Sequence, residues 1–71
     1  PIVSTKKTLA NLNIRTGAGT KYPLAATTPN PLAKGAIVQV FATKPDANGK
    51  TWCKIDYIKE EWVAGWYLGA V

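Results

Sequence analysis

The chain has 71 residues, with nine Lys or Arg against four Asp or Glu, and a formal net charge of +5. This length makes one domain with a small core, and the 46% of hydrophobic residues exclude a disordered chain. No apolar run approaches the ~20 residues of a membrane-spanning helix. The lack of His and the single cysteine, Cys53, exclude Ser-His and Cys-His catalysis and an intrachain disulfide, so we expect no metal and no cofactor.

The positive charge permits attraction to anionic polymers such as nucleic acid or teichoic acid. Because the basic residues are scattered, a merely solvated basic surface remains the alternative. Residues 1–7 have no apolar signal-peptide core and are predicted to be a linker or tail. We therefore expect residues 8–71 to be one domain of a longer protein.

Residues 8–16 are predicted to form the first strand, because apolar and polar side chains alternate there with a period of two. The alternating sets are Ala10, Leu12 and Ile14 against Asn11, Asn13 and Arg15. Two glycines then end the strand, Gly17 and Gly19, since glycine adopts turn conformations at little cost.

Residues 20–31 are predicted to be one long loop. Three prolines exclude a central strand there, because proline cannot donate to a strand ladder; they are Pro23, Pro29 and Pro31. The run Pro29-Asn30-Pro31 favours an extended, polyproline-like backbone. Lys34-Gly35 is predicted to turn the chain into the next strand.

Two strands with a hairpin between them are predicted next. Residues 36–43 alternate, with Ala36, Val38, Val40 and Ala42 on one face and Ile37 and Phe41 on the other. The Asn-Gly pair inside residues 45–49 is a strong hairpin signal. Residues 51–58 follow, with Cys53, Ile55 and Tyr57 on one face and Trp52, Lys54 and Asp56 on the other.

A turn at Lys59-Glu60, a short strand over residues 62–64 and a terminal turn complete the chain. No segment shows helical apolar spacing over three turns. Short strands, tight turns and one long loop predict an all-β fold, a small, partly open barrel of about five to seven strands. Closing the sheet hides its edge strands.

Five motifs resemble those of bacterial SH3 domains, the SH3b family. In chain order they are LNIRTGAGT (residues 12–20), LAKG (32–35), VQV (38–40), WCKI (52–55) and WVAGWYL (62–68). They stand in the family's order and cover nearly the whole domain. The chain departs from the family pattern at Ala18, where Pro is usual, at Glu61, where Gly is usual, and in a longer stretch over residues 25–31.

The resemblance implies an SH3-like, partly open barrel that binds and does not catalyse. Such domains accompany cell-wall hydrolases, phage endolysins, autolysins and surface proteins, and hold them on peptidoglycan through its peptide stem or cross-bridge. The resemblance therefore implies an extracellular or wall-associated monomer beside a parent catalytic domain. The net positive charge adds an anionic wall polymer as an alternative partner. Fold alone does not fix function, and the longer loop leaves the ligand's identity open.

Three Trp, three Tyr and one Phe are more aromatic residues than so small a core can hide. Because Cys53 and Ile55 are expected to face inward, Trp52 is expected to face outward. By the same alternation Val63 is expected to face inward and Trp62 outward. Exposed indoles form apolar platforms that usually mark interaction sites. The alternative for Trp52 is packing against the long loop.

The predicted ligand-binding residues are Tyr22, Trp52, Tyr67, Trp66 and Asn13, and for each a purely structural role is the alternative. Tyr67 resembles the groove tyrosine of SH3 folds, and Asn13 could bond a peptide backbone or its own turn. We expect Arg15 to hold loop carbonyls or Asp56, and Cys53 to be a small buried core residue.

Three other functions compete with wall binding. Catalysis is not expected, because the four carboxylates lie in or beside turns and nothing suggests that they converge. A protein-interaction or autoinhibitory module remains open, although residues 20–34 hold no acidic residue to pair with an Arg-flanked proline motif. Single-stranded nucleic acid is the least expected ligand, since no dense Lys/Arg stripe is present.

Overall fold

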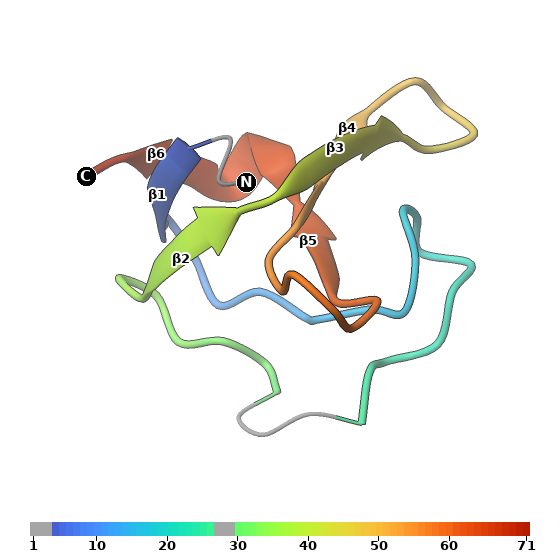
Figure 1. Cartoon of the computed structure of the whole chain (residues 1–71), viewed down its shortest axis with the longest axis horizontal. Coiled ribbons are helices and arrows are strands. Elements are labelled where there is room, and N and C mark those ends of the chain that lie inside the picture. The colour runs from blue at the N-terminus through green and yellow to red at the C-terminus, as the bar shows by residue number, and fades with distance from the viewer. Residues whose placement is uncertain (1–3, 27–29) are drawn as a thin grey trace.

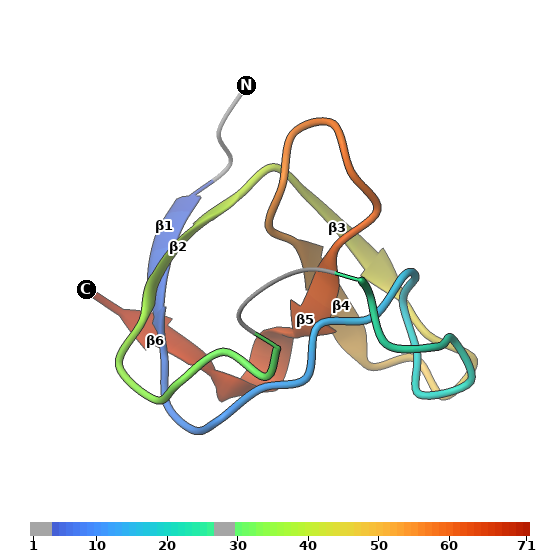
Figure 2. The ribbon, with the colours of Figure 1, turned by 90° about the horizontal axis from the view of Figure 1, so that it is seen from below.

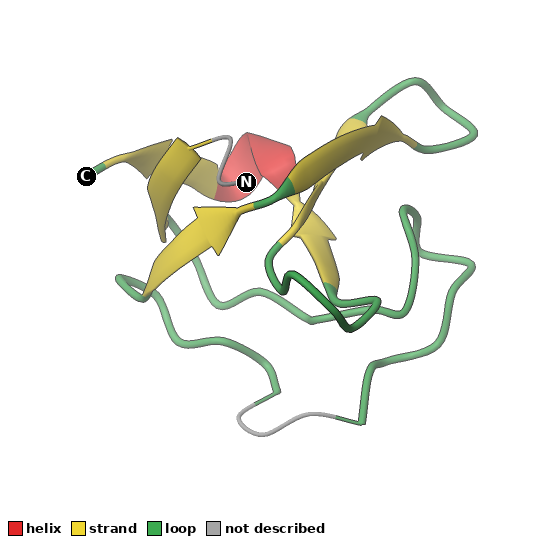
Figure 3. Cartoon of the chain, viewed as in Figure 1, coloured by secondary structure: helices red, strands yellow, loops and turns green. Residues whose placement is uncertain are grey.

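The computed structural model describes residues 4–26 and 30–71 (Figure 1). This part of the chain forms six short strands and one 3-10 turn: β1 (Ser4–Thr8), β2 (Ile37–Val40), β3 (Ala42–Pro45), β4 (Thr51–Lys54), β5 (Trp62–Ala64), η1 (Gly65–Tyr67) and β6 (Leu68–Ala70). Figure 3 shows the 3-10 turn η1 in red and the strands in yellow. The predicted all-β fold of short strands with a long loop is confirmed.

The strands form two antiparallel three-stranded sheets, in the orders β2-β1-β6 and β3-β4-β5. Among the described residues no helix is long and apolar enough to cross a bilayer. Only Phe41 separates β2 from β3, and Figure 2 shows the chain passing there from one sheet to the other. The backbone N–H of Phe41 donates to Lys54 of the second sheet at 2.9 Å. The predicted continuous strand over residues 36–43 is therefore wrong, because its two halves pair in different sheets.

The N-terminal segment corrects the prediction of a tail over residues 1–7. Residues 4–7 belong to β1, which lies between β2 and β6 at the centre of its sheet; residues 1–3 lie outside the described part. Exposure alternates along β1, ending in the buried Thr8. Its hydroxyl donates to the Ala33 carbonyl at 2.8 Å and accepts from the Ala36 N–H at 2.9 Å. The inward side chains of β1 are mostly polar, so no apolar alternation marked the strand.

The strand predicted over residues 8–16 is found only in part. Leu12 and Ile14 are buried while Asn11 and Asn13 are exposed, so the predicted alternation is correct. Beyond Thr8, however, the described backbone pairs only through isolated bridges, from Leu12 to Leu32 and from Arg15 to Leu24 and Trp62. Most of this segment lies against the long loop, and a loop cannot supply a continuous ladder.

The side chain of Asn30 makes three of the hydrogen bonds that hold the long loop in place. Its Oδ1 accepts from the Ile14 N–H, and its Nδ2 donates to the carbonyls of Ile14 and Ala25, each at 3.0 Å. In the predicted run Pro29-Asn30-Pro31, Pro29 lies outside the described residues and the Asn30-Pro31 peptide bond is cis. The loop therefore follows a defined course on either side of residues 27–29.

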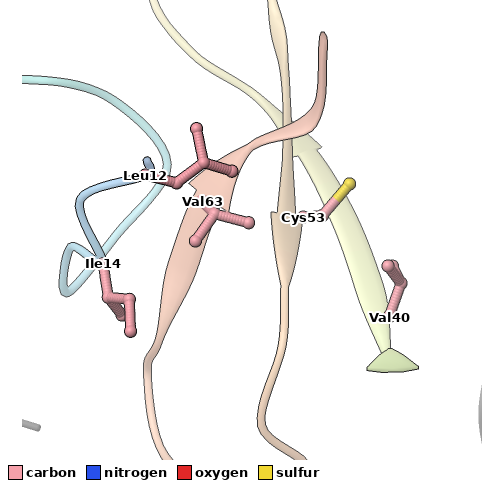
Figure 4. Close-up of a cluster of buried hydrophobic side chains, with 5 residues drawn as sticks. All are labelled: Leu12, Ile14, Val40, Cys53 and Val63. Carbon is pink, nitrogen blue, oxygen red and sulfur yellow. The ribbon is translucent and has the colours of Figure 1, made fainter. Parts of the chain in front are cut away.

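Two apolar clusters lie on opposite faces of the sheet β3-β4-β5. Cys53 and Val63 are opposite each other in the register of β4 and β5, and so are Trp52 and Ala64. The first pair belongs to the cluster Leu12, Ile14, Val40, Cys53 and Val63, which Figure 4 shows. The second pair belongs to the cluster Ala18, Trp52, Trp62 and Ala64. Strands β4 and β5 therefore carry buried residues on both faces, whereas β3 is mostly exposed.

The second cluster corrects the outward placement of Trp52 and Trp62, which are only 3% and 7% exposed. The alternation did place Trp52 opposite Cys53, but Ala18 and its neighbours pack over that face. The Trp52 indole N–H donates to Asp46 at 3.0 Å, and that of Trp62 donates to Glu60 at 3.0 Å. These bonds allow two large polar-tipped rings to be buried.

The predicted strand over residues 51–58 stops at Lys54. The Asp56 carboxylate then accepts from the backbone N–H groups of Ile58 at 2.9 Å and Lys59 at 2.7 Å, which closes a turn instead of extending the ladder. Tyr57, predicted to face inward, is consequently exposed. The Asn-Gly hairpin before β4 is confirmed, with Gly49 at φ +80°, a conformation that favours glycine.

Candidate functional site

A shallow groove of about 200 Å³ brings together four of the five predicted ligand-binding residues: Asn13, Trp52, Trp66 and Tyr67. The other residues that line it are Asn11, Leu12, Arg15, Thr20 and Ala64. We call this the aromatic groove. Two exposed rings lie beside two asparagine side chains, with Trp52 as the buried base.

The 3-10 turn η1 places the exposed rings. It follows β5 directly and sets Trp66 at 5.7 Å from Trp52, edge to face with an interplanar angle of 88°. Tyr67 lies 5.8 Å from Trp66, tilted by 42°. Both rings are nearly half exposed, at 44% and 45%. The result is a supported aromatic surface rather than isolated mobile rings.

Gly65 makes this turn possible. A Cβ at this position would lie 2.8 Å from the Thr51 carbonyl oxygen and 3.1 Å from the Cys53 sulfur. Only glycine therefore allows η1 to pack closely on β4, which is what brings Trp66 over Trp52.

The polar wall of the groove comes from residues 11–15. Asn11 accepts a hydrogen bond from the Lys34 N–H at 2.8 Å, which ties this wall to the long loop. Asn13 is exposed and presents an amide donor and acceptor. Sequence reasoning missed Asn11, although the same alternation that selected Asn13 places both on one face.

Arg15 lines the groove and also contacts a loop carbonyl, as predicted. Its guanidinium donates to the Tyr22 carbonyl at 2.9 Å, and its backbone exchanges two hydrogen bonds of 2.8 Å with Trp62. The Arg15 guanidinium is therefore already bonded within the protein. It is the only charged residue in the described lining of the groove.

Tyr22 does not line the aromatic groove. Its ring packs flat against Gly17, where an added Cβ would lie 2.6 Å from a ring carbon. The Lys21 ammonium lies 5.4 Å from the same ring. With its carbonyl held by Arg15, Tyr22 steadies the turn behind the groove.

Beside the aromatic groove, Trp66 also borders a cavity of about 500 Å³ lined by Lys50, Thr51, Cys53 and Gly65. The Lys50 ammonium lies 5.0 Å from the centre of the Trp66 ring. Cys53 is buried as predicted, and burial raises the pKa of its thiol, an effect that the charge of Lys6 only partly offsets. The thiol is therefore not an activated nucleophile.

Three of the four carboxylates are engaged in structural bonds. Those of Asp46 and Glu60 accept indole N–H bonds, which are the largest cause of their lowered pKa values, and that of Asp56 accepts backbone N–H bonds with the same effect. A general acid needs the opposite shift. Within the described part of the chain, no group of three or more His, Cys, Asp or Glu is placed to hold a metal ion.

No known family, curated protein or solved structure matches this chain.

Proposed function

We propose that the chain is a non-catalytic module that binds an extended peptide of peptidoglycan, its stem or cross-bridge, in the aromatic groove. It would thereby hold a larger cell-wall hydrolase, endolysin or surface protein on the wall. The observation that carries the proposal is the meeting of Asn13, Trp66 and Tyr67 over the buried Trp52. The SH3b-like motifs supply the ligand class.

The groove suits a backbone with small side chains. Flat rings pack against glycine or alanine, which leave the peptide backbone accessible, and the asparagine amides can pair with that backbone. A contact of this size gives modest affinity, about micromolar or weaker. A second copy of the module in the same protein would raise the apparent affinity through avidity.

Charge favours a neutral ligand over a polyanion. Arg15 is the only charged residue in the described lining, and its guanidinium already bonds Tyr22. Phosphate recognition would make binding fall steeply with salt, whereas packing on a neutral peptide does not. Binding to purified peptidoglycan, with and without teichoic acid, should therefore persist as salt is raised.

The deciding experiment compares exposed aromatic residues inside and outside the groove. Tyr67→Ala and Trp66→Ala are expected to weaken peptidoglycan binding by about 1–3 kcal/mol, the range for a central aromatic contact. Tyr57→Ala, an exposed tyrosine outside the groove, is the matched control and should bind like the parent. If both groove variants stay folded and bind as well as Tyr57→Ala, the proposal is wrong.

A further inference from the structure

A second groove, of about 580 Å³, shares no lining residue with the aromatic groove. It is lined by Ile37, Val38, Gln39, Phe41, Ile55, Asp56, Tyr57 and Ile58. Its walls are largely apolar and exposed, with Ile58 at 77%, Tyr57 at 60% and Ile37 at 59%. Phe41 and Tyr57 pack together at 5.7 Å. We call this the β2 groove.

One wall of the β2 groove is the edge of a sheet. In the described part of the chain β2 pairs with β1 alone. The Thr8 N–H donates to the Ala36 carbonyl at 2.9 Å, which fixes the phase of the β1–β2 ladder. Because hydrogen-bonded pairs alternate in an antiparallel ladder, Val38 and Val40 are the residues of β2 that bond to β1. The N–H and C=O groups of Ile37 and Gln39 therefore point away from it.

This edge lacks the usual protection against further pairing. Edge strands are commonly blunted by proline or by charged side chains. The edge strand β3 carries both, in Lys44 and Pro45, whereas β2 reads Ile-Val-Gln-Val. Two N–H and two C=O groups thus border an apolar groove with no residue in β2 that opposes strand addition.

We infer that the β2 groove binds an extended segment of another polypeptide by strand addition, with apolar side chains at alternate positions and acidic residues at its ends. Main-chain bonds to Ile37 and Gln39 would set its register, and Phe41, Tyr57 and Ile58 would cover its apolar face. This inference does not rest on wall binding, because the two grooves share no residue.

Charge selects the acidic ends. Lys7 is opposite Ile37 in the β1–β2 register and is exposed, and Lys59 follows Ile58 and is exposed. Asp56, the single acidic residue in the described lining of the groove, already accepts two backbone N–H bonds. A second copy of the chain would bring a net charge of +5 against +5, which opposes self-pairing along this edge.

Amide hydrogen exchange tests the edge directly. In the free domain the amides of Val38 and Val40 should be protected and those of Ile37 and Gln39 should exchange fast. The probe is a nine-residue peptide with valine and phenylalanine at alternate positions and glutamate at both ends. Its binding should protect Ile37 and Gln39. Fast exchange that persists at saturating peptide, or protection already present in the free dilute domain, overturns the inference.

Variants separate strand addition from apolar adhesion. Gln39→Pro removes an N–H that the β1 ladder does not use, and it should weaken peptide binding at least about tenfold, the effect of losing one well-made hydrogen bond. Gln39→Ala keeps the N–H and should bind within about twofold of the parent. Both should bind peptidoglycan unchanged. If Gln39→Pro does not fold, alternate N-methylation of the peptide makes the same test on the parent domain.

Three outcomes contradict the inference. If N-methylated peptide binds as well as the unmodified one, the groove is an apolar surface without strand pairing. If a peptide with lysine ends binds as well as the glutamate peptide, the charge argument is wrong. If sedimentation shows a dimer whose formation protects Ile37 and Gln39, the occupant is a second copy of the chain.

Discussion

At the scale of single residues, the three tryptophans divide into two kinds. Trp52 and Trp62 are buried and donate their indole N–H groups to Asp46 and Glu60, respectively. Trp66, in contrast, is exposed in the wall of the aromatic groove. Each carboxylate lies near its tryptophan in sequence, so these pairs are local. The sequence alone does not mark them, because the same spacing would suit an exposed ring and a solvated carboxylate.

This division predicts a difference in stability between two tryptophan variants. Trp52→Ala should lose about 3–5 kcal/mol through the cavity it leaves, enough to unfold much of so small a domain. Trp66→Ala should cost about 1 kcal/mol or less, since its ring is half exposed. Urea unfolding followed by circular dichroism measures both. Equal losses would mean that Trp52 is not a core residue.

The burial of Cys53 predicts slow chemistry at its thiol. Because burial raises the thiol pKa and the side chain is only 8% exposed, little thiolate meets the reagent. A disulfide reagent at pH 8 should label the native domain slowly and the urea-unfolded chain fast. Native labelling at the unfolded rate would show that the cavity beside Trp66 opens onto the sulfur.

At the scale of elements, the long loop depends on Asn30. Asn30→Ala removes three bonds at once and should cost about 1–3 kcal/mol. Asn30→Asp keeps the acceptor for Ile14 but loses both donated bonds, so it should also destabilise. The exposed Asn13→Ala is the control: it should leave the melting temperature near the parent's while weakening peptidoglycan binding. A control that melts as low as Asn30→Ala would contradict this role for Asn30.

Sequence reasoning found the elements whose signals are local. The Asn-Gly turn, the alternating residues of β4 and the short strand β5 can each be recognised from the residues that form them. It missed β1, whose inward positions are polar, and the division between β2 and β3, because apolar alternation runs on through Phe41. Asn13, Trp66 and Tyr67, which it named as ligand-binding residues, line one groove in the structure, and their role in binding stays a prediction. It could not place Trp52, because the cover over that ring is the chain around Ala18 folding back from far along the sequence.

At the scale of the whole molecule, the two grooves offer separate surfaces on one small domain. The aromatic groove is built from β4, β5, η1 and residues 11–20. The β2 groove is built from β2, Phe41 and the turn after β4. Since they share no residue, a ligand in one does not block the other by direct contact. The two proposals together predict that the domain joins a wall peptide to a second polypeptide.

The last prediction concerns the pH dependence of folding. Hydrogen bonds from Trp52, from backbone N–H groups and from Trp62 lower the pKa values of Asp46, Asp56 and Glu60 below their ordinary values of 3.8, 3.8 and 4.5. A carboxylate whose pKa is lower in the folded state stabilises the fold above its unfolded pKa. That contribution is lost as pH falls through the folded pKa. Stability should therefore be level near neutral pH and decline from about pH 5 towards pH 2.

Melting temperatures measured across this range check the sign. Asp46→Asn should lower the melting temperature at pH 7, where the parent carboxylate is ionised. The difference from the parent should shrink as the pH falls through the lowered pKa of Asp46, because the parent side chain then also becomes neutral. Because Asp46 also accepts from the N–H groups of Asn48 and Lys50, the variant loosens the hairpin together with the indole of Trp52. The attraction between the charges of Asp46 and Lys50 is screened by salt, so the difference should shrink at high ionic strength without vanishing. A parent domain whose stability rises on acidification would show that these carboxylates do not support the fold.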